Sequence, residues 1–166
     1  LGESRFPTLI EFLLEKITGQ VSSVERRGGA QSLAQVVSIF AHGQRTELIE
    51  EVLGSKDSKS ENTREGVMWF LHYLPEALGP ERYKELLSGQ LLVILKGLSD
   101  SSESVRGVAM KAGQVIINRH TGPQTIGTVL PVLQNSIVYS EDSRLRHSSI
   151  QLLGDLLYKV GECQAT

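Results

Sequence analysis

One pattern recurs about every forty residues along the chain and constrains the fold more than any other feature. An arginine is followed by a small or slim residue three positions later and by apolar or small residues seven and ten positions later. The arginines are Arg26, Arg64, Arg106 and Arg146, which stand 38, 42 and 40 residues apart. A fixed period of this length is typical of proteins built by stacking one supersecondary unit on the next. We therefore expect an array of similar units.

The units are helical. Apolar residues recur at spacings of three and four, as at Leu9, Leu13 and Ile17, and sustained alternation of apolar and polar residues is absent. No Asn-Gly or Asp-Gly hairpin turn occurs. The sequence predicts an all-α fold of eight antiparallel helices, at about 5–18, 22–41, 44–54, 61–78, 80–98, 101–119, 123–138 and 142–161.

Helix starts are marked by polar caps, and Pro7, Pro80 and Pro123 stand where first turns are expected to begin. Ser22, Ser58 and Asp100 each precede a glutamate by three residues, which predicts capping boxes at three helix starts. Pro75 and Pro131 fall inside predicted helices, and we expect them to kink rather than end them, because the apolar pattern continues past each.

The repeated arginine stands early in its helix, where a positive charge is unfavourable beside the helix dipole. We expect a carboxylate partner for it, such as Asp100 or Asp142 on the turn of the adjacent repeat. The small residues that follow, such as Ala109 and Ser149, would let neighbouring backbones approach closely. A structural role in setting the stacking register is favoured over partner contact for all four arginines.

Composition excludes several classes of protein. The chain has 166 residues, is 40% hydrophobic and 22% charged, and carries a net charge of -2, which is typical of a soluble globular domain. General nucleic-acid and membrane-surface binders are usually basic, so the charge argues against both. The single cysteine, Cys163, permits no internal disulfide and favours a reducing compartment. The chain starts at Leu1, and we expect it to be a fragment of a longer protein.

Catalytic and cofactor motifs are missing from the sequence. The four histidines, His42, His72, His120 and His147, have no ligand at metal-binding spacing, so no metal is expected. Phosphate-binding loops, dinucleotide-binding turns and nucleophile elbows are also absent. The sequence predicts a non-enzyme without cofactors.

The surface formed by the second helix of each pair is the expected binding face of such an array. Trp69, Tyr158 and Arg144 are residue types enriched at interaction hot spots. For Trp69, packing against the first helix of its pair is favoured over an exposed anchor. For Arg144, an ordinary solvated arginine is an equal alternative. The expected face includes Arg27, Gln31, Ser38, Asn62, Glu65, Trp69, His72, Ser104, Lys111, Gln114, Asn118, Arg144, His147, Gln151, Asp155 and Tyr158.

The period and the pattern resemble HEAT repeats. The implied architecture is a single right-handed α-solenoid over 1–166, with repeats at about 3–42, 43–79, 80–120 and 121–162. Four stretches, ERRGGAQSLAQVV, REGVMWFLHYLPEALG, ILKGLSDSSESVRGVAMKAGQVII and SRLRHSSIQLLGDLLYKVG, further resemble the family of very large, ribosome-associated general-control translational activators. That family relays amino-acid starvation to the kinase that phosphorylates translation initiation factor 2 alpha.

The resemblance implies a cytoplasmic, polysome-associated scaffold that binds RWD domains, notably that of the kinase, through arginine. Arg144 and Arg146 are the favoured contacts. The full set of expected partner-binding residues is Arg144, Arg146, Trp69, His72, Lys111, Gln151 and Tyr158. The alternatives are a ribosome or ribosomal RNA contact, using Arg27, Arg64, Lys111 and Arg144, or a purely architectural spacer. DNA and membrane partners are not expected.

A fragment cut from such an array would expose apolar surface at its ends. We expect the isolated chain to self-associate through these ends, without physiological meaning, and the candidate residues are Leu9, Leu13, Leu156 and Val160.

Overall fold

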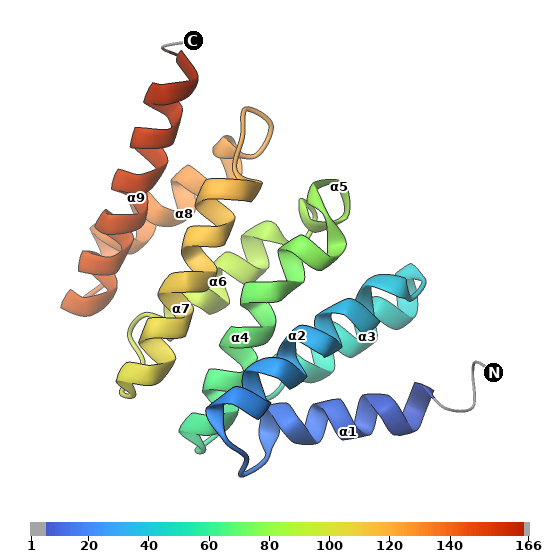
Figure 1. Cartoon of the computed structure of the whole chain (residues 1–166). Helices are drawn as coiled ribbons and strands as arrows, with labels where there is room; N and C mark the ends of the chain where they lie inside the picture. The colour runs from blue at the N-terminus through green and yellow to red at the C-terminus, as the bar shows by residue number, and fades with distance from the viewer. Residues whose placement is uncertain (1–5, 165–166) are drawn as a thin grey trace. The chain divides into compact units, whose positions relative to one another are not determined.

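The computed structural model describes residues 6–164, and all the regular structure in this range is helical (Figure 1). The chain divides into two compact units, residues 1–78 and 79–166. The division falls beside the boundary expected between the second and third repeats. An all-α fold is thus confirmed.

The first unit contains four helices, and α2 contacts the other three. The packing of α2 is most extensive against α4 and α1 (Figure 1). A row of fully buried side chains from α2 and α4, including Leu33, Phe70 and Leu71, forms the core. The helices are α1 (Phe6–Thr18), α2 (Ser23–Ile39), α3 (His42–Leu53) and α4 (Glu61–Leu78).

Polar caps start α2 and α4. The Ser22 hydroxyl accepts the Glu25 amide N–H, and the Glu25 carboxylate accepts the Ser22 amide N–H, so the predicted capping box is confirmed. Helix α4 begins at Glu61, as predicted, but the prediction that Ser58 caps it is wrong. Ser60 directly precedes α4, and its hydroxyl accepts the amide N–H of Thr63.

Small residues bring the helices of the first unit into backbone contact. A Cβ on Gly66 of α4 would collide with the Ile17 carbonyl and lie 2.8 Å from the Ile17 Cγ2 atom of α1. A Cβ on Gly29 of α2 would lie 2.6 Å from the Cβ of Lys16. The hydroxyl of Thr63 also donates to the Thr18 carbonyl at 2.9 Å. These positions leave no room for a side-chain methyl group.

The second unit contains five α-helices and one π-helical turn. Its last helix, α9, packs along α8 and also contacts α6, α7 and η1, while α6 contacts α7 and α8 (Figure 1). The elements are α5 (Pro80–Tyr83), α6 (Leu87–Gly97), α7 (Glu103–Val115), η1 (Ile116–His120), α8 (Ile126–Tyr139) and α9 (Ser143–Gln164).

The single helix predicted over 80–98 is interrupted, which corrects the sequence prediction. Pro80 occupies the first turn of α5, as expected from its missing N–H and restricted φ. After α5 the chain forms a tighter turn, in which the Leu86 amide donates to the carbonyl of Tyr83, three residues earlier, at 2.9 Å. Gly79, before Pro80, has a φ of 77°, a conformation that other residues rarely adopt.

The start of α7 also differs from the prediction. Asp100 does not cap this helix, which begins at Glu103 directly after Ser102. The Asp100 carboxylate instead accepts the Ser102 amide N–H at 2.9 Å. This bond stabilises the turn that precedes α7.

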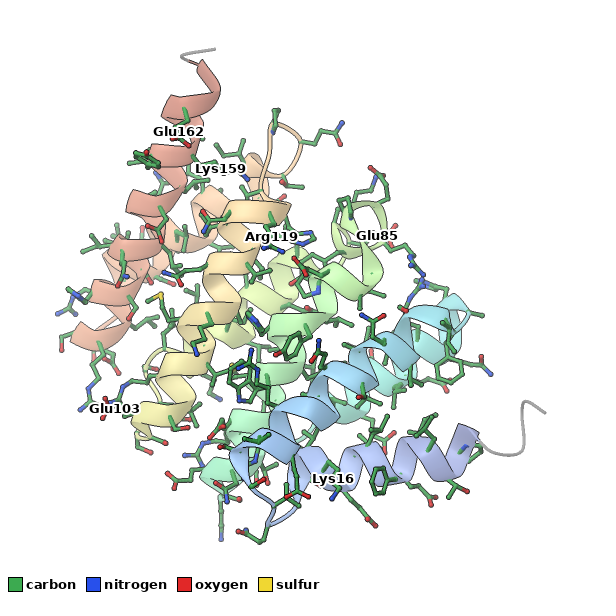
Figure 2. The ribbon with its side chains drawn as sticks, in the orientation of Figure 1. Lys16, Glu85, Glu103, Arg119, Lys159 and Glu162 are labelled. Carbon is green, nitrogen blue, oxygen red and sulfur yellow. The ribbon has the colours of Figure 1, made fainter. Side chains whose placement is uncertain are left out.

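The end of the predicted helix 101–119 is a π-helix, which places extra carbonyl groups at its C-terminus without helical partners. Lys159 of α9 supplies donors to them: its Nζ atom lies 3.1 Å from the Ile117 carbonyl and 2.6 Å from the Thr121 carbonyl (Figure 2). The Thr121 hydroxyl donates to the Ile116 carbonyl at 2.9 Å. These bonds hold α9 against the end of η1.

The small position of the repeated pattern is buried every time it occurs, as predicted. This holds for Gly29, Val67, Ala109 and Ser149. The expectation of exposed end residues is partly wrong. Leu13 and Leu156 belong to the core, with 6% and 1% exposure, whereas Leu9 is 42% exposed and Val160 is half-buried.

Pro75 and Pro131 lie inside α4 and α8, as expected. Among the described residues, no helix combines the length and apolar character needed to cross a membrane. The side chain of Cys163 lies outside the described part of the chain.

His120 lies at the C-terminal end of η1 in a partly buried setting. Its ring packs edge-on against the buried Tyr83 ring, with 5.3 Å between the ring centroids. Burial lowers the pKa of His120 from its ordinary value, and the positive charges of Arg119 and Lys159 lower it further. The neutral imidazole is therefore favoured in the folded protein.

Gly66→Ala should destabilise the first unit by about 1–3 kcal/mol, because the added methyl group meets the Ile17 backbone. Gly28→Ala is the matched control, since a Cβ there meets nothing within 4 Å and α2 gains helix propensity. Urea unfolding followed by circular dichroism measures both variants. Equal stability of the two would contradict the close approach.

Stability should fall as the pH is lowered below about 6.5, the ordinary pKa of histidine. The pKa of His120 is lower in the folded state, so the unfolded chain binds the proton more readily and protonation favours unfolding. His120→Gln should flatten this part of the pH profile, measured as Tm between pH 5 and 8. His42→Gln, at an exposed position, is the control and should leave the slope unchanged.

Candidate partner-binding surface

The four repeated arginines share one hydrogen-bonding arrangement. Each guanidinium reaches back and donates to main-chain carbonyls five or six residues earlier, in the turn before its own helix. The acceptors are Val21 for Arg26, Ser58 and Lys59 for Arg64, Asp100 and Ser101 for Arg106, and Ser140 for Arg146, at distances of 2.6–3.2 Å. The positive charge is thus placed against carbonyl dipoles of the preceding turn.

The predicted carboxylate partners fit only in part. Arg26 faces Glu65 of α4, with 3.5 Å between its Nη1 atom and the Oε1 atom, and both side chains are almost fully buried. Asp142, however, is not the partner of a neighbouring arginine. Its carboxylate accepts the amide N–H groups of Arg144 and Leu145 and caps α9.

A shallow groove of about 610 Å³ runs between the first turns of α7 and α9 in the second unit. Glu103, at the start of α7, and Arg144, at the start of α9, give it charges of both signs. The remaining lining is Leu98, Arg106, Gly107, Met110, Ser143, His147 and Ser148. The groove therefore combines a small apolar floor with an exposed cation and an exposed anion.

Arg144 and Arg146 have different environments although they are two residues apart. The Arg146 side chain is half-buried, and it is held by the Ser140 carbonyl. The Arg144 side chain is exposed and makes no hydrogen bond or ion pair with any residue that the structure describes. Of the two predicted contacts, Arg144 alone offers its full set of donors to a partner.

Helical spacing aligns Arg144 with three further residues, and together they form what we term the α9 face: Arg144, His147, Gln151 and Tyr158. They are separated by three, four and seven residues, so they lie on one side of the helix, and all four are exposed. Tyr158 is 70% exposed. Its hydroxyl donates to the Glu162 carboxylate, which raises the pKa of Tyr158 (Figure 2).

The other predicted site residues lie elsewhere. Lys111 is exposed on α7, and His72 is half-buried on α4. Trp69, also on α4, is only 7% exposed, and its indole N–H donates to the Glu65 carboxylate at 3.1 Å. The alternative of an exposed tryptophan anchor is therefore wrong, because α4 is apolar on most sides and this ring is covered.

Sequence reasoning missed the contributions of α7 to the groove, notably Glu103 and Met110. No local signal identifies them, because the groove forms only where α7 and α9 come together. Sequence reasoning also did not predict that the Arg27 guanidinium lies over the Trp69 ring. In the described residues, no cluster of three or more histidine, cysteine or acidic side chains could hold a metal ion.

Comparison with known proteins gives consistent matches. A family model described as the HEAT repeats of the stalled ribosome sensor GCN1 matches residues 44–156. Proteins named eIF-2-alpha kinase activator GCN1 are similar, with 36% identity over 162 residues in Dictyostelium discoideum and 34% over 160 in Saccharomyces cerevisiae. The stalled ribosome sensor GCN1 of Homo sapiens is 35% identical over 162 residues. Each match covers 96% of this chain and 6% of the relative.

Arg146→Ala should lower the free energy of unfolding by about 1–2 kcal/mol, because the Ser140 carbonyl loses a charged donor. Arg144→Ala should change it by less than about 0.5 kcal/mol, since this side chain is exposed and unbonded. Urea unfolding of both variants under identical conditions makes the comparison. A larger loss for Arg144→Ala would contradict the division of roles between the two arginines.

Proposed function

The chain belongs to the HEAT-repeat family of the stalled ribosome sensor GCN1, and we propose that it is a non-catalytic scaffold that binds the RWD domain of the starvation-responsive kinase. The chain spans 6% of the length of these relatives. Relatives named as kinase activators support a role in translation control. The proposed setting is the cytoplasm, on polysomes.

The α9 face is the observation that supports this proposal most directly. Its four residues are exposed, and they present an arginine with unused donors, a histidine, an amide and a tyrosine. Arginine and tyrosine are enriched among residues that dominate binding energy at protein interfaces. The groove beside Arg144 supplies a recess for a protruding side chain of the partner.

Scaffolding requires only binding and position. A kinase tethered through its RWD domain experiences a raised effective concentration near the other components on the ribosome. Each of the four repeated arginines is hydrogen-bonded to the turn before its helix. For α9 this is the bond from Arg146 to the Ser140 carbonyl, and we expect it to keep the α9 face in place when a partner docks. A rigid surface loses less entropy on binding than a flexible one.

A contact with the ribosome or its RNA is the second candidate, and the names of relatives as stalled ribosome sensors favour it. Two of the four cationic residues expected to form it make hydrogen bonds within the chain, Arg64 through Nη1 and Arg27 through Nε alone. Arg27 donates to the Tyr73 hydroxyl, and Arg64 donates to two carbonyls. A continuous path for phosphates is therefore less well supported than a protein contact. A purely architectural role would leave the α9 face without a partner.

The test is calorimetric titration of the chain with a purified kinase RWD domain. Wild type should bind, and Arg144→Ala should weaken binding about tenfold or more, with unchanged helical circular dichroism. Lys59→Ala is the matched control, because it removes the same charge from an exposed loop residue in the first unit and should bind normally.

Two results would count against this assignment. Equal weakening by Lys59→Ala would indicate a general electrostatic effect rather than a contact on α9. Failure of the folded wild-type chain to bind would reject the proposed partner. Co-sedimentation with ribosomes, with a steep dependence on salt, would then favour the RNA contact.

A further inference from the structure

A cluster of one arginine and two aromatic rings joins α2 to α4 in the first unit. The Arg27 guanidinium lies over the Trp69 ring, 4.6 Å from its centroid, and 6.0 Å from the centroid of the Tyr73 ring. The two aromatic rings are stacked with 6.1 Å between centroids. The Arg27 Nε atom donates to the Tyr73 hydroxyl at 2.6 Å.

The base of this cluster is held rigidly. The Trp69 indole N–H donates to the Glu65 carboxylate, and that carboxylate also faces the buried Arg26 guanidinium at 3.5 Å. Trp69 is 7% exposed, so its ring supports the Arg27 guanidinium from below and is not itself available to a partner. Arg27 itself is exposed.

The contacts of Arg27 use one face of its guanidinium and one of its nitrogen atoms. Cation–π attraction to Trp69 and the hydrogen bond to Tyr73 fix the plane and its rotation. The two Nη atoms make no hydrogen bond or ion pair with any residue in the described part of the chain. The side chain is thus ordered, while its terminal N–H donors are unused.

An arginine ordered in this way is suited to bind a carboxylate. The planar fork of N–H donors matches two carboxylate oxygens, and bonds of this kind are among the strongest that proteins make. Because the side chain is already immobilised, less conformational entropy is lost when the partner binds. A lysine could not replace it, since an ammonium neither stacks as a plane nor forms two parallel bonds.

Neighbouring charges favour a carboxylate over a nucleic acid. Arg26 faces Glu65, Lys16 bonds to Glu25 at 3.0 Å, and Arg64 is bonded to carbonyls. Surfaces that bind nucleic acids present several cations that are available to phosphates. Here Arg27 has available donors, whereas the neighbouring cations are bonded within the chain. The net charge of -2 agrees with this distinction.

We propose that Arg27, stacked on Trp69 and positioned by Tyr73, is a docking point for a carboxylate in an acidic segment of a protein partner. This site is separate from the α9 face, lies in the other unit, and does not depend on binding of an RWD domain. Tyr73 and Trp69 are positioning residues, and Arg27 makes the contact.

The experiment uses the single tryptophan of the chain as the reporter, because Trp69 lies directly beneath the proposed contact. The probe is a short synthetic oligoglutamate peptide, and oligoglutamine of the same length is the control peptide. Oligoglutamate should change the Trp69 fluorescence saturably, and oligoglutamine should not. Neither peptide contains an RWD domain, so the result is independent of the proposed function.

Three variants test the assignment to Arg27. Arg27→Ala and Arg27→Lys should each weaken oligoglutamate binding about tenfold or more, because neither retains the stacked fork. Tyr73→Phe should weaken it about twofold to fivefold, since the Nε atom loses its acceptor and the plane is free to rotate. Lys59→Ala, which removes the same charge from an exposed loop residue outside the cluster, should bind like wild type.

Circular dichroism establishes that each variant is folded, and Tyr73→Phe keeps the proposal testable if Arg27→Ala does not fold. The proposal is overturned if folded wild type gives no saturable change with oligoglutamate. It is equally overturned if Arg27→Ala or Arg27→Lys binds like wild type. Tighter binding of oligouridine than of oligoglutamate, with a steep salt dependence, would reassign the site to phosphate.

Discussion

The bond from an early helical arginine to the carbonyls of the preceding turn is the contact on which the rest of the structure depends. A positive charge near the N-terminus of a helix is unfavourable beside the helix dipole. The long side chain solves this by reaching back to the turn, where the carbonyl oxygens carry partial negative charge. Each of the four helices is thereby joined to the segment that leads into it, and the helix direction is set by the turn.

Close packing of helices then depends on small residues at fixed distances from these arginines. Three residues after each arginine the side chain is buried, whether it is glycine, valine, alanine or serine. At Gly66, two residues after Arg64 and next to the repeated position Val67, the approach to Ile17 leaves room only for glycine, because backbone meets backbone. Interiors at this density transmit a change of one methyl group to their neighbours. The arginine joins the helix to the turn before it, and the small residue allows the helix to lie close to its neighbour.

Function is assigned to groups that the fold does not use. Arg26 and Arg146 donate to main-chain carbonyls of the preceding turns, whereas Arg144 keeps its side-chain donors available and Arg27 keeps those of its two Nη atoms. Arg144 lies on the exposed α9 face beside a groove of mixed charge. Arg27 is held in place by aromatic rings and keeps its terminal N–H groups available. Adjacent or nearby arginines thus divide into structural and binding roles according to what surrounds each guanidinium.

The sequence by itself determined the helical class, the period of the repeat and the buried small positions, because these follow from spacing along one chain. It also placed Arg144, Gln151 and Tyr158 on one face, since helical periodicity is a local property. Tertiary structure decided the rest. The π-helix at 116–120, whose carbonyl at Ile117 binds Lys159 of α9, and the burial of Trp69 depend on contacts between segments distant in sequence. The break within 80–98 and the carbonyl acceptors of the arginines are local, but residue types alone did not identify them. The type of a residue determines which hydrogen bonds its side chain can form. Only the folded structure determines which of these bonds are formed within the chain and which donors remain available to a partner.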